Sequence, residues 1–456
     1  MKIELEENKI RLEPSDWRWS ATIVGLVKYF DEYDINYDIE DEFIEFNEDD
    51  ITDEKYLLFV EKHFSEMMHH KKVEEILEGT NLTEEVIKIV NEKLSKNTSS
   101  NTIMLRTFKG IKFDGTNSQE IKDIIEKNRM EIISKTFKGG RALYYNFCNE
   151  NNMLADTGKS CRVRGYSVDM GKKSKSVCYM RDHNTFVYQD SKLFDFIPFA
   201  FSKTREAFFV NNNFTIEQLI RTNKNSDKND DEKMRSKLFF KAQDSSSYID
   251  YDVEIIKKER EKDYFETLIL RKDAIKIFEK IKEKTLEAIA QPCNIKRSEK
   301  GQDIWLDVEK IAVDNILNTI KMDNLIDKLL KGYNNHQYLI AHLLKINDKL
   351  YEKIYKEAEM TEKQKGAYAS AMEVRAVLSG RSNKIRAYEQ RLISAITLKD
   401  YDRVQEILLH LSAFTQVKMN FLIDLFENFE KNKNLAYTFI NTLGTKKRAN
   451  KKGDVK

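Results

Sequence analysis

The sequence has almost no net charge and very little proline. Its 77 lysine and arginine residues are nearly balanced by 76 aspartate and glutamate residues, which gives a formal net charge of +1 at pH 7. The total charge therefore gives no indication of nucleic-acid binding, although it says nothing about how the charges are distributed. Only three of the 456 residues are proline, so helix breakers are scarce and a helix-rich structure is expected.

Long apolar stretches and paired cysteines are also missing. No run approaches the roughly 18 apolar residues that cross a membrane, and the charged segment Met1–Leu12 lacks the apolar core of a signal peptide. The four cysteines lie far apart, at Cys148, Cys161, Cys178 and Cys293, which is not the pattern of a disulfide framework. We therefore expect a cytoplasmic protein without membrane association.

The motifs of common hydrolytic and phosphate-binding sites are absent from the sequence. There is no Gly-x-Ser-x-Gly, no Gly-x-x-x-x-Gly-Lys-Ser/Thr and no His-Glu-x-x-His. His69 and His70 are adjacent, so on a helix they would point about 100° apart, and we interpret them as surface residues. We expect no catalytic residues and no enzyme activity.

The cysteines could in principle bind zinc. Structural zinc sites usually take two ligands from one close pair, such as Cys-x-x-Cys, because a short turn presents both thiolates to the ion. Cys148, Cys161 and Cys178 contain no such pair. We expect buried or incidental cysteines, no zinc and no other cofactor.

The apolar patterns predict an α+β fold class, in which a mixed N-terminal domain is followed by an all-α C-terminal helical bundle. The expected divisions are a mixed domain at 1–270, a helical connecting region at 271–360, the bundle at 361–444 and a basic disordered tail at 445–456. Alternation predicts strands in Ile3–Leu12, Tyr251–Ile256 and Tyr264–Leu270, and a hairpin in Asn36–Phe46. Helical spacing is expected in Trp17–Phe30, Tyr56–Leu77, Thr83–Leu94, Ile121–Lys135 and nearly everything after Lys272, with breaks that include Gln291–Gly301 and Gly332–Asn335.

Acidic and basic residues are separated along the chain. The first sixty residues are rich in acids, whereas residues 157–181 hold the basic side chains Lys159, Arg162, Arg164, Lys172, Lys173 and Lys175 among glycines and tyrosines. Glycine lets a backbone approach DNA closely, cations neutralise phosphates, and tyrosine stacks on unpaired bases. This composition predicts contact with duplex DNA, with a solvated loop as the alternative. A charge reversal at Arg162 and Arg164 is expected to weaken duplex binding while leaving assembly intact.

Aromatic residues dominate Phe194–Phe214, and we expect most of them in the core. Embedded among them are the polar residues Lys203, Arg205, Asn211, Asn212 and Asn213. Asparagine amides can donate to and accept from base edges, so these five residues are further candidates for DNA contact. The alternative is a turn that uses asparagine in the left-handed conformation.

The last third of the chain combines apolar helical stripes with exposed cations. Leu392, Ile396, Val404, Ile407 and Leu411 have the spacing of a buried helix face. The cations expected on the outer faces, and predicted to hold single-stranded DNA, are Arg375, Arg381, Lys384, Arg386 and Arg391. A solvated face without a ligand is the alternative.

Three parts of the sequence resemble one protein family. The segments Ser15–Phe30 (SDWRWSATIVGLVKYF) and Phe196–Phe214 are similar to parts of the large subunits of type I-B CRISPR interference complexes of the Cascade type. So is the distal part, Leu378–Phe414 followed by Leu435–Gly444, and the three parts occur in matching order. One departure is the wide spacing of the cysteines, since members often carry close cysteine pairs for a zinc-binding insert.

The resemblance implies a subunit without catalytic activity. Its N-terminal domain would recognise the protospacer-adjacent motif in duplex DNA, help to open the strands and recruit the helicase-nuclease. Its C-terminal bundle would resemble the small subunit and line the path of the displaced strand. The implied partners are crRNA, the other Cascade subunits, double-stranded and single-stranded target DNA, and the helicase-nuclease. Guide pairing would supply the long sequence specificity, so the protein would read only a short motif.

Two other functions fit the sequence less well. One is a metal-dependent nuclease with a helical accessory domain, which needs a cluster of acids or histidines that the sequence does not show. The other is a helical scaffold that binds only protein through its acidic N-terminal face.

Overall fold

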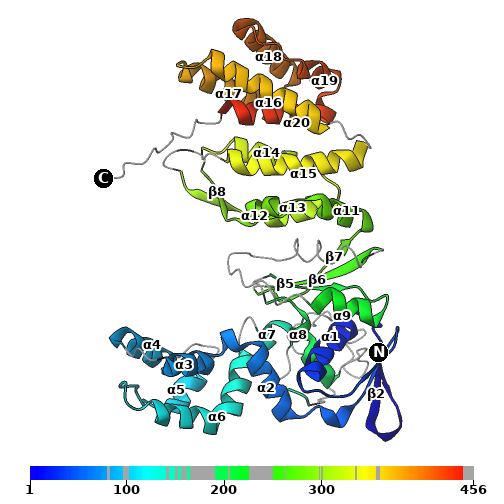
Figure 1. Ribbon diagram of the computed structural model, residues 1–456, viewed down its shortest axis with the longest axis vertical. Coiled ribbons are helices and arrows are strands. Elements are labelled where there is room, and N and C mark those ends of the chain that lie inside the picture. The colour runs from blue at the N-terminus through cyan, green and yellow to red at the C-terminus, as the bar shows by residue number, and fades with distance from the viewer. Residues whose placement is uncertain are drawn as a thin grey trace, which may run out of the picture. The chain divides into compact units, whose positions relative to one another are not determined.

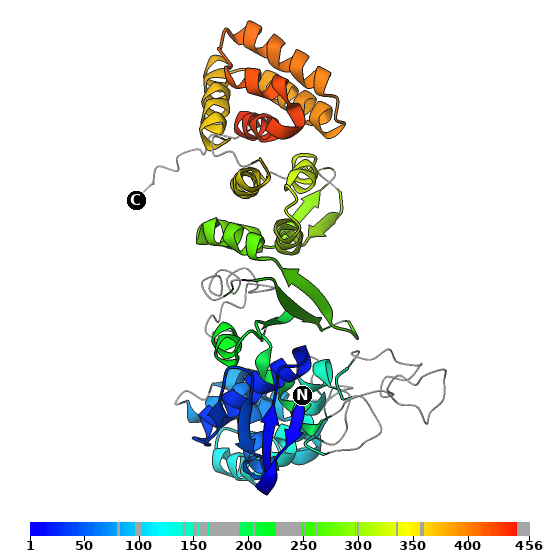
Figure 2. The ribbon, with the colours of Figure 1, turned by 90° about the vertical axis from the view of Figure 1, so that its right-hand side faces the viewer.

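The computed structural model describes residues 1–79, 83–95, 102–139, 143–148, 153–155, 162–164, 191–203, 206–224, 249, 251–260, 262–296, 298, 301–333, 336–355 and 360–444. The described residues form two units, which Figures 1 and 2 show from two directions. Unit 1 contains those up to Ile269, and unit 2 contains those from Leu270 onward. Unit 1 is a mixture of helices and strands and unit 2 is mainly helical, which confirms the predicted α+β class and the helical C-terminal region.

Unit 1 begins with a four-stranded antiparallel sheet. Its strands are β1 (Lys2–Glu4), β2 (Lys9–Leu12), β3 (Asp38–Ile39) and β4 (Ile44–Asn47), in the order β1-β2-β4-β3. Ile10 pairs with Phe46 and Leu12 pairs with Ile44, and all four side chains are buried. The alternation of these residues places them on one face of the sheet, as a half-buried strand requires. The predicted hairpin is confirmed. The single strand predicted over Ile3–Leu12 is wrong in its extent, because the chain turns through η1 (Glu6–Asn8) and the segment forms the two paired strands β1 and β2.

Helix α1 (Trp17–Glu32) lies at the centre of the main core of unit 1. Asp16 caps it, because its carboxylate accepts a hydrogen bond of 2.8 Å from the Arg18 amide. Gly25 allows a very close approach to η5 (Lys192–Phe196), since a Cβ atom placed there would lie 2.2 Å from the Phe196 carbonyl oxygen. This core therefore depends on a main-chain contact that no other residue type permits at Gly25.

Aromatic side chains fill the space between α1, α2 (Asp53–His63), η5 and α8 (Ile197–Ala200). Phe196 and Phe199 are completely buried, and both pack on Tyr56, with ring centroids 5.2 and 5.8 Å away. The expectation that Phe194–Phe214 is mostly core is confirmed, although Phe214 is 69% exposed. The core part of this segment forms short helical turns followed by β5 (Glu206–Asn211), so it is more than one central strand.

A second, separate core in unit 1 is built mainly from helices. It contains α3 (His69–Glu78), α4 (Glu84–Leu94), α5 (Ile103–Phe108) and α6 (Ser118–Gly139), which Figure 1 shows gathered together. One continuous helix was predicted over Tyr56–Leu77, and this is wrong. The chain turns through η3 (Ser65–Met67) between α2 and α3, because Phe64 and Met68 on either side of the turn are both buried.

The remaining strands of unit 1 form a second sheet. Its order is β5-β6-β7, with β6 (Val253–Glu259) antiparallel to β5 and next to β7 (Glu266–Leu270). The predicted strand pair after residue 250 is thus confirmed. The short helices α7 (Tyr144–Phe147) and α9 (Ile216–Lys224) also belong to this unit.

Unit 2 consists of helices and one hairpin. The helices are α11 (Lys272–Lys280), α12 (Glu283–Ala290), α13 (Val308–Leu317), α14 (Asp323–Leu330), α15 (Gln337–Tyr355), α16 (Met360–Val377), α17 (Ser382–Thr397), α18 (Tyr401–Thr415), α19 (Phe421–Glu427) and α20 (Phe429–Gly444). The break expected at Gln291–Gly301 is instead the start of an antiparallel hairpin, β8 (Cys293–Lys296) and β9 (Asp303–Leu306). Cys293 and Ile295, two residues apart on β8, are both buried. This alternation covers too few residues to identify a strand within a mainly helical region of the sequence.

A buried polar network joins four helices of unit 2. The Asn347 amide donates to Asp323 at 3.0 Å and to Asn434 at 2.9 Å. Next to it, the Gln364 amide donates to Asp348 at 2.6 Å. Since α14, α15, α16 and α20 each contribute to this network, it fixes how these helices pack against one another.

Candidate nucleic-acid interface

Five of the eleven side chains predicted to contact duplex DNA cannot be placed. Outside the described residues lie Lys159, Lys172, Lys173, Lys175 and Arg205, so their contacts stay predictions. Arg162 and Arg164 are described, and both have partners inside unit 1.

Arg162 is an internal residue. Its side chain is fully buried, and its Nη1 atom donates to both carboxylate oxygens of Asp195, at 3.0 and 2.8 Å. Its Nη2 atom donates to the carbonyl oxygen of Ala155. From this position the guanidinium cannot reach a DNA phosphate. The expected contact between Arg162 and duplex DNA is therefore corrected: this arginine stabilises the core, because its charge is needed to pair a buried carboxylate.

Asp195 receives hydrogen bonds from several directions. The Tyr144 hydroxyl donates to Oδ1 at 2.7 Å, and the Leu154 amide donates to Oδ2 at 2.6 Å. Burial raises the pKa of the Asp195 carboxyl, and the positive charge of Arg162 opposes that rise. The result is a hydrogen-bonded ion pair that attaches two separate chain segments to the aromatic core.

Arg164 is also engaged. Its Nη1 atom donates to the Tyr145 carbonyl oxygen at 2.7 Å, its Nη2 atom pairs with Asp263, and its guanidinium lies 4.2 Å from the centre of the Tyr145 ring. The Asp263 side chain is 57% exposed, so this ion pair lies at the edge of unit 1. A DNA phosphate would have to compete with Asp263 for this arginine.

The three asparagines at the end of β5 use their amides within unit 1. Asn211 donates to Glu254 at 3.1 Å, and Asn212 donates to Thr222 at 2.9 Å. Asn213 donates to a main-chain carbonyl in the turn before α1, at 3.2 Å. Asn211 and Asn212 are buried, so their predicted contact with base edges is corrected. None of the three has a positive φ, so the left-handed turn is wrong as well.

Lys203 is the exposed member of the same predicted set. Its ammonium group lies 5.9 Å from the centre of the Phe64 ring. It remains a candidate for phosphate contact, because the residue is exposed.

The five cations predicted to hold a single strand lie on more than one face of the helices. Lys384 and Arg391 are seven residues apart on α17, which places them on one side of the helix. The Lys384 ammonium lies 4.7 Å from the Phe414 ring, and the Arg391 guanidinium lies 5.9 Å from the Tyr388 ring. Arg381 precedes the first turn of α17 and is exposed.

Arg386 lies on another face of α17, together with Gln390 and Ile393. These residues follow the i, i+4, i+7 spacing of one helical face. Arg375, near the end of α16, lines the same hollow as Arg386 and donates to the carbonyl oxygen of Thr442 at 3.2 Å. Of the predicted set, the structure thus brings together Arg375 and Arg386.

Two adjoining hollows in unit 2 form what we call the α14–α17 groove. Their volumes are about 590 and 610 Å³, and they share the lining residues Leu330, Gly332, Tyr333, Arg386, Gln390 and Ile393. The buried side chains Ile340, Ile393 and Leu443 form its apolar floor. Its edges are polar, with the exposed residues Lys331, Asn383 and Gln390.

The charged residues of the groove are mainly positive. Lys331, Arg375 and Arg386 lie along it, against the carboxylate of Glu389. In the described part of the chain, no hydrogen bond or ion pair engages the Arg386 guanidinium, and its side chain is exposed. Burial lowers the pKa of His336 at the inner wall, which favours its neutral form at pH 7. Arg386 is therefore the cation best placed to receive an anionic ligand.

The first turn of α17 adds to this positive character. The helix begins at Ser382 without a side-chain cap, and its first turn contains no acidic residue. Ser382 and Asn383 line the first hollow, so the positive end of the helix dipole lies at the groove without a carboxylate in that turn to offset it.

Several groove residues were not predicted from the sequence. Tyr333, Lys331, Asn383 and Gln390 had no motif to mark them, although Tyr333 falls in an expected break between helices. A tyrosine that follows Gly332 directly in such a break was the available signal.

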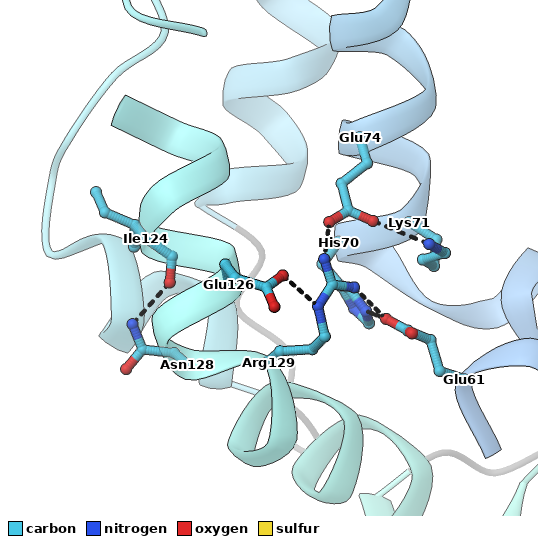
Figure 3. Close-up of polar contacts among 8 residues, drawn as sticks. All are labelled: Glu61, His70, Lys71, Glu74, Ile124, Glu126, Asn128 and Arg129. Carbon is cyan, nitrogen blue, oxygen red and sulfur yellow. Dashed lines mark hydrogen bonds and ion pairs between the residues drawn. The ribbon is translucent and has the colours of Figure 1, made fainter. Parts of the chain in front are cut away.

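A different polar cluster lies in unit 1, between the two cores (Figure 3). Arg129 of α6 pairs with Glu61, Glu74 and Glu126, and the buried His70 ring lies 2.6 Å from Glu61. The interpretation of His70 as a surface residue is wrong, because it is fully buried. The pKa of Glu61 lies below its ordinary value, because hydrogen bonds from His70 and Arg129 outweigh the opposite effect of burial. The cluster joins α2, α3 and α6.

The described residues contain no group of three or more histidine, cysteine, aspartate or glutamate side chains placed to hold a metal ion. Cys148 is buried, and its thiol lies 3.8 Å from the Phe194 carbonyl oxygen, whereas Cys161 and Cys178 lie outside the described residues. The expected absence of zinc stays a prediction.

Comparison with protein families identifies the chain. The model of the family described as CRISPR-associated protein Csx8 matches residues 9–228 and 220–443. The chain belongs to the Csx8 family. The two matches span both units, so Csx8 membership extends to the sheet of unit 1 and to the α14–α17 groove. No curated protein and no solved structure matches the chain.

Csx8 membership confirms the CRISPR part of the resemblance seen in the sequence. The family is CRISPR-associated, but it does not specify type I-B. Among the described helices, none has the length and apolar character needed to cross a membrane.

Proposed function

We propose that this Csx8 protein is the large subunit of a type I-B CRISPR RNA-guided surveillance complex in the cytoplasm, and that it has no catalytic role. It recognises the protospacer-adjacent motif in duplex DNA, assists strand opening, holds the displaced strand and recruits the helicase-nuclease. Its partners are crRNA, the other Cascade subunits and target DNA.

The observation that carries the proposal is the α14–α17 groove in a CRISPR-associated chain. The groove combines Arg386, which no described residue pairs with, and exposed amides over an apolar floor. A phosphate backbone is bound mainly by cations that release condensed counterions, and amides bind sugar and base groups. Arg386 and Lys331 supply the first property, and Asn383 and Gln390 supply the second.

Recognition of the duplex motif is assigned to unit 1. With Arg162, Asn211 and Asn212 buried, the remaining candidates are Lys159, Lys172, Lys173, Lys175, Lys203, Arg205 and Asn213. Arg164 could join them only by leaving Asp263. The near-neutral total charge of the chain agrees with a complex in which other subunits supply much of the positive channel.

The proposal is tested with the assembled complex and single-stranded DNA. Arg386→Gln should weaken binding at moderate salt and lower the slope of log affinity against log salt by roughly 0.7, the contribution of one phosphate on a single strand. Arg403→Gln is the matched control, because Arg403 lies in the same unit but pairs with Glu406 at 2.5 Å. Equal affinities and slopes for the wild type and both variants would refute the role of the groove.

The non-catalytic role has a separate test. The purified chain is incubated with labelled single-stranded and double-stranded DNA in the presence of magnesium or manganese. We expect intact substrate at all times. Cleavage that persists through successive purification steps and follows the chain on a sizing column would contradict the proposal and favour the nuclease alternative.

A further inference from the structure

We propose that the α14–α17 groove contains a site for one unpaired nucleotide, in which the base stacks on Tyr333 and the adjoining phosphate binds Arg386. This inference rests on the proposed function and deepens it, because it names the residue that distinguishes an unpaired strand from a duplex. Nothing in the family match assigns such a site.

Tyr333 is exposed although its main chain is fixed. The residue is 51% exposed and lines both hollows of the groove. Its amide donates to the carbonyl oxygen of Lys296 on β8 at 2.7 Å, and the preceding Gly332 packs so closely on Ile295 that a Cβ atom there would lie 2.9 Å away. A ring on an anchored main chain loses little freedom when a ligand binds it.

The groove has the size and chemistry that a nucleotide needs. Each hollow, at about 590 and 610 Å³, lies within the range of roughly 300 to 1,000 Å³ that is typical of small-ligand sites. The apolar floor suits the faces of a base, while the amides of Asn383 and Gln390 can each donate and accept at a base edge. The neutral state of His336 adds no charge to the inner wall.

The charges favour a phosphate next to the base. Arg386 lines both hollows together with Tyr333, and no described residue pairs with its guanidinium. The Glu389 carboxylate is the opposing charge, but it lies against the end of α20, where a Cβ atom on Gly444 would be 2.0 Å from its Oε1 atom. A phosphate can therefore bind at Arg386, away from Glu389.

A stacking site selects unpaired nucleotides. A base inside a duplex already has neighbours on both faces, whereas an unpaired base gains stacking energy from an aromatic ring. Such stacking is worth about 1–3 kcal/mol per base, or roughly a 5- to 150-fold change in affinity. The groove should thus prefer single strands to duplexes when Tyr333 is present.

The experiment measures binding of an oligodeoxythymidine of about 16 nucleotides, which covers common site sizes for one binding domain. The full-length chain in the assembled complex is compared with Tyr333→Leu, Tyr333→Phe and the control Tyr368→Leu. Tyr368 is 53% exposed on α16 of the same unit and does not line the groove. A second oligonucleotide has the same length but carries abasic positions throughout.

We expect Tyr333→Leu to bind the thymidine strand at least fivefold more weakly, with Tyr333→Phe and Tyr368→Leu close to the wild type. The abasic strand should bind the wild type and Tyr333→Leu equally, since it has no base to stack. An oligouridine of the same length shows whether the site also accepts RNA. The inference of a nucleotide site holds if Tyr333→Leu weakens the binding of the thymidine strand, the uridine strand or both.

Three other outcomes separate the possible failures. If the wild type binds both strands and Tyr333→Leu binds them equally well, the stacking site is refuted while the proposed function stands. If the wild-type complex binds no single strand, the proposed function itself fails. If Tyr333→Leu leaves strand binding unchanged and instead removes a subunit from the complex, the groove binds protein and the inference is overturned.

Discussion

At the scale of single residues, Arg162 shows why a basic side chain in a basic segment need not face a ligand. Asp195 lies in the aromatic core, 33 positions further along the chain, and its buried carboxylate requires a cation. Nothing in the local pattern around Arg162 reveals this partner. The sequence led us to expect that charge reversal at Arg162 and Arg164 would leave assembly intact. A carboxylate in place of Arg162 would instead lie beside Asp195 in the core, so this variant cannot serve as a test of DNA binding.

The Arg162–Asp195 pair leads to a stability prediction. Arg162→Met should destabilise unit 1 by about 3–5 kcal/mol, because it leaves a buried carboxylate without its cation. Adding Asp195→Asn to that variant should recover about 1 kcal/mol or more, since the second change removes the unpaired charge. Urea unfolding followed by circular dichroism measures both. Arg403→Met, at an exposed ion pair, is the control and should cost less than about 1 kcal/mol; an equal loss at both sites would contradict the prediction.

Asp348 leads to a prediction about pH. Burial raises the pKa of its carboxyl to about 7, with Lys349 opposing and Glu352 adding to the rise. The pKa of Asp348 is thus higher in the folded chain than in the unfolded chain. The contribution of the protonated carboxyl to the free energy of unfolding is therefore complete below about pH 4 and is lost as the pH rises through about 7. Asp348→Asn has a side chain that stays neutral at every pH. Between pH 4 and 7 the free energy of unfolding of this variant should therefore rise relative to that of the wild type, by on the order of 1 kcal/mol or more.

The measurement for Asp348→Asn is urea unfolding at several pH values between 4 and 8. Asp402→Asn, at an exposed position of α18, is the control and should show a much smaller change with pH. A difference between Asp348→Asn and wild type that stays constant over this range would show that Asp348 ionises as readily in the folded chain as in the unfolded one.

At the scale of elements, glycines on two helices should respond in opposite ways to the same substitution. Gly25 of α1 faces the Phe196 carbonyl at a distance that leaves no room for a Cβ atom, whereas Gly366 of α16 has open space around it. Gly25→Ala should therefore destabilise the chain by about 2 kcal/mol or more, by forcing helix and turn apart. Gly366→Ala should stabilise it by roughly 0.5–1 kcal/mol, through helix propensity. Thermal unfolding of both variants checks this, and a loss of stability at both positions would argue against the close packing of α1.

Elements whose signals are local were predictable from the sequence. Helix α1 follows an Asp16 cap and has regular apolar spacing, and the β3–β4 hairpin has a clear alternation. The turn between α2 and α3 was missed, because Phe64 and Met68 look like ordinary members of a helical stripe. The α14–α17 groove could not be predicted, since its lining comes from the ends of α14, α16 and α20, from the start of α15 and from residues along α17. Only tertiary packing brings those segments together.

At the scale of the whole molecule, the division into two units implies that each unfolds with its own core. The aromatic core belongs to unit 1, and the polar network around Asn347 and Asp348 belongs to unit 2. Chains with separate cores frequently depart from two-state unfolding.

We therefore predict two unfolding transitions that respond to different substitutions. Arg162→Met should lower the midpoint of one transition only, and Asp348→Asn at pH 8 should raise the midpoint of the other. Differential scanning calorimetry of the wild type and both variants resolves the transitions. A single transition that both substitutions move would mean that the two cores unfold together.

The distribution of cations on α17 has a consequence for an opened duplex. Arg386 faces the groove, whereas Lys384 and Arg391 point to another side of the same helix. An α-helix with its side chains is about 10 Å across. If each face were occupied by one of two complementary strands, the helix would act as a wedge between them, and base pairs could not re-form until one strand had dissociated.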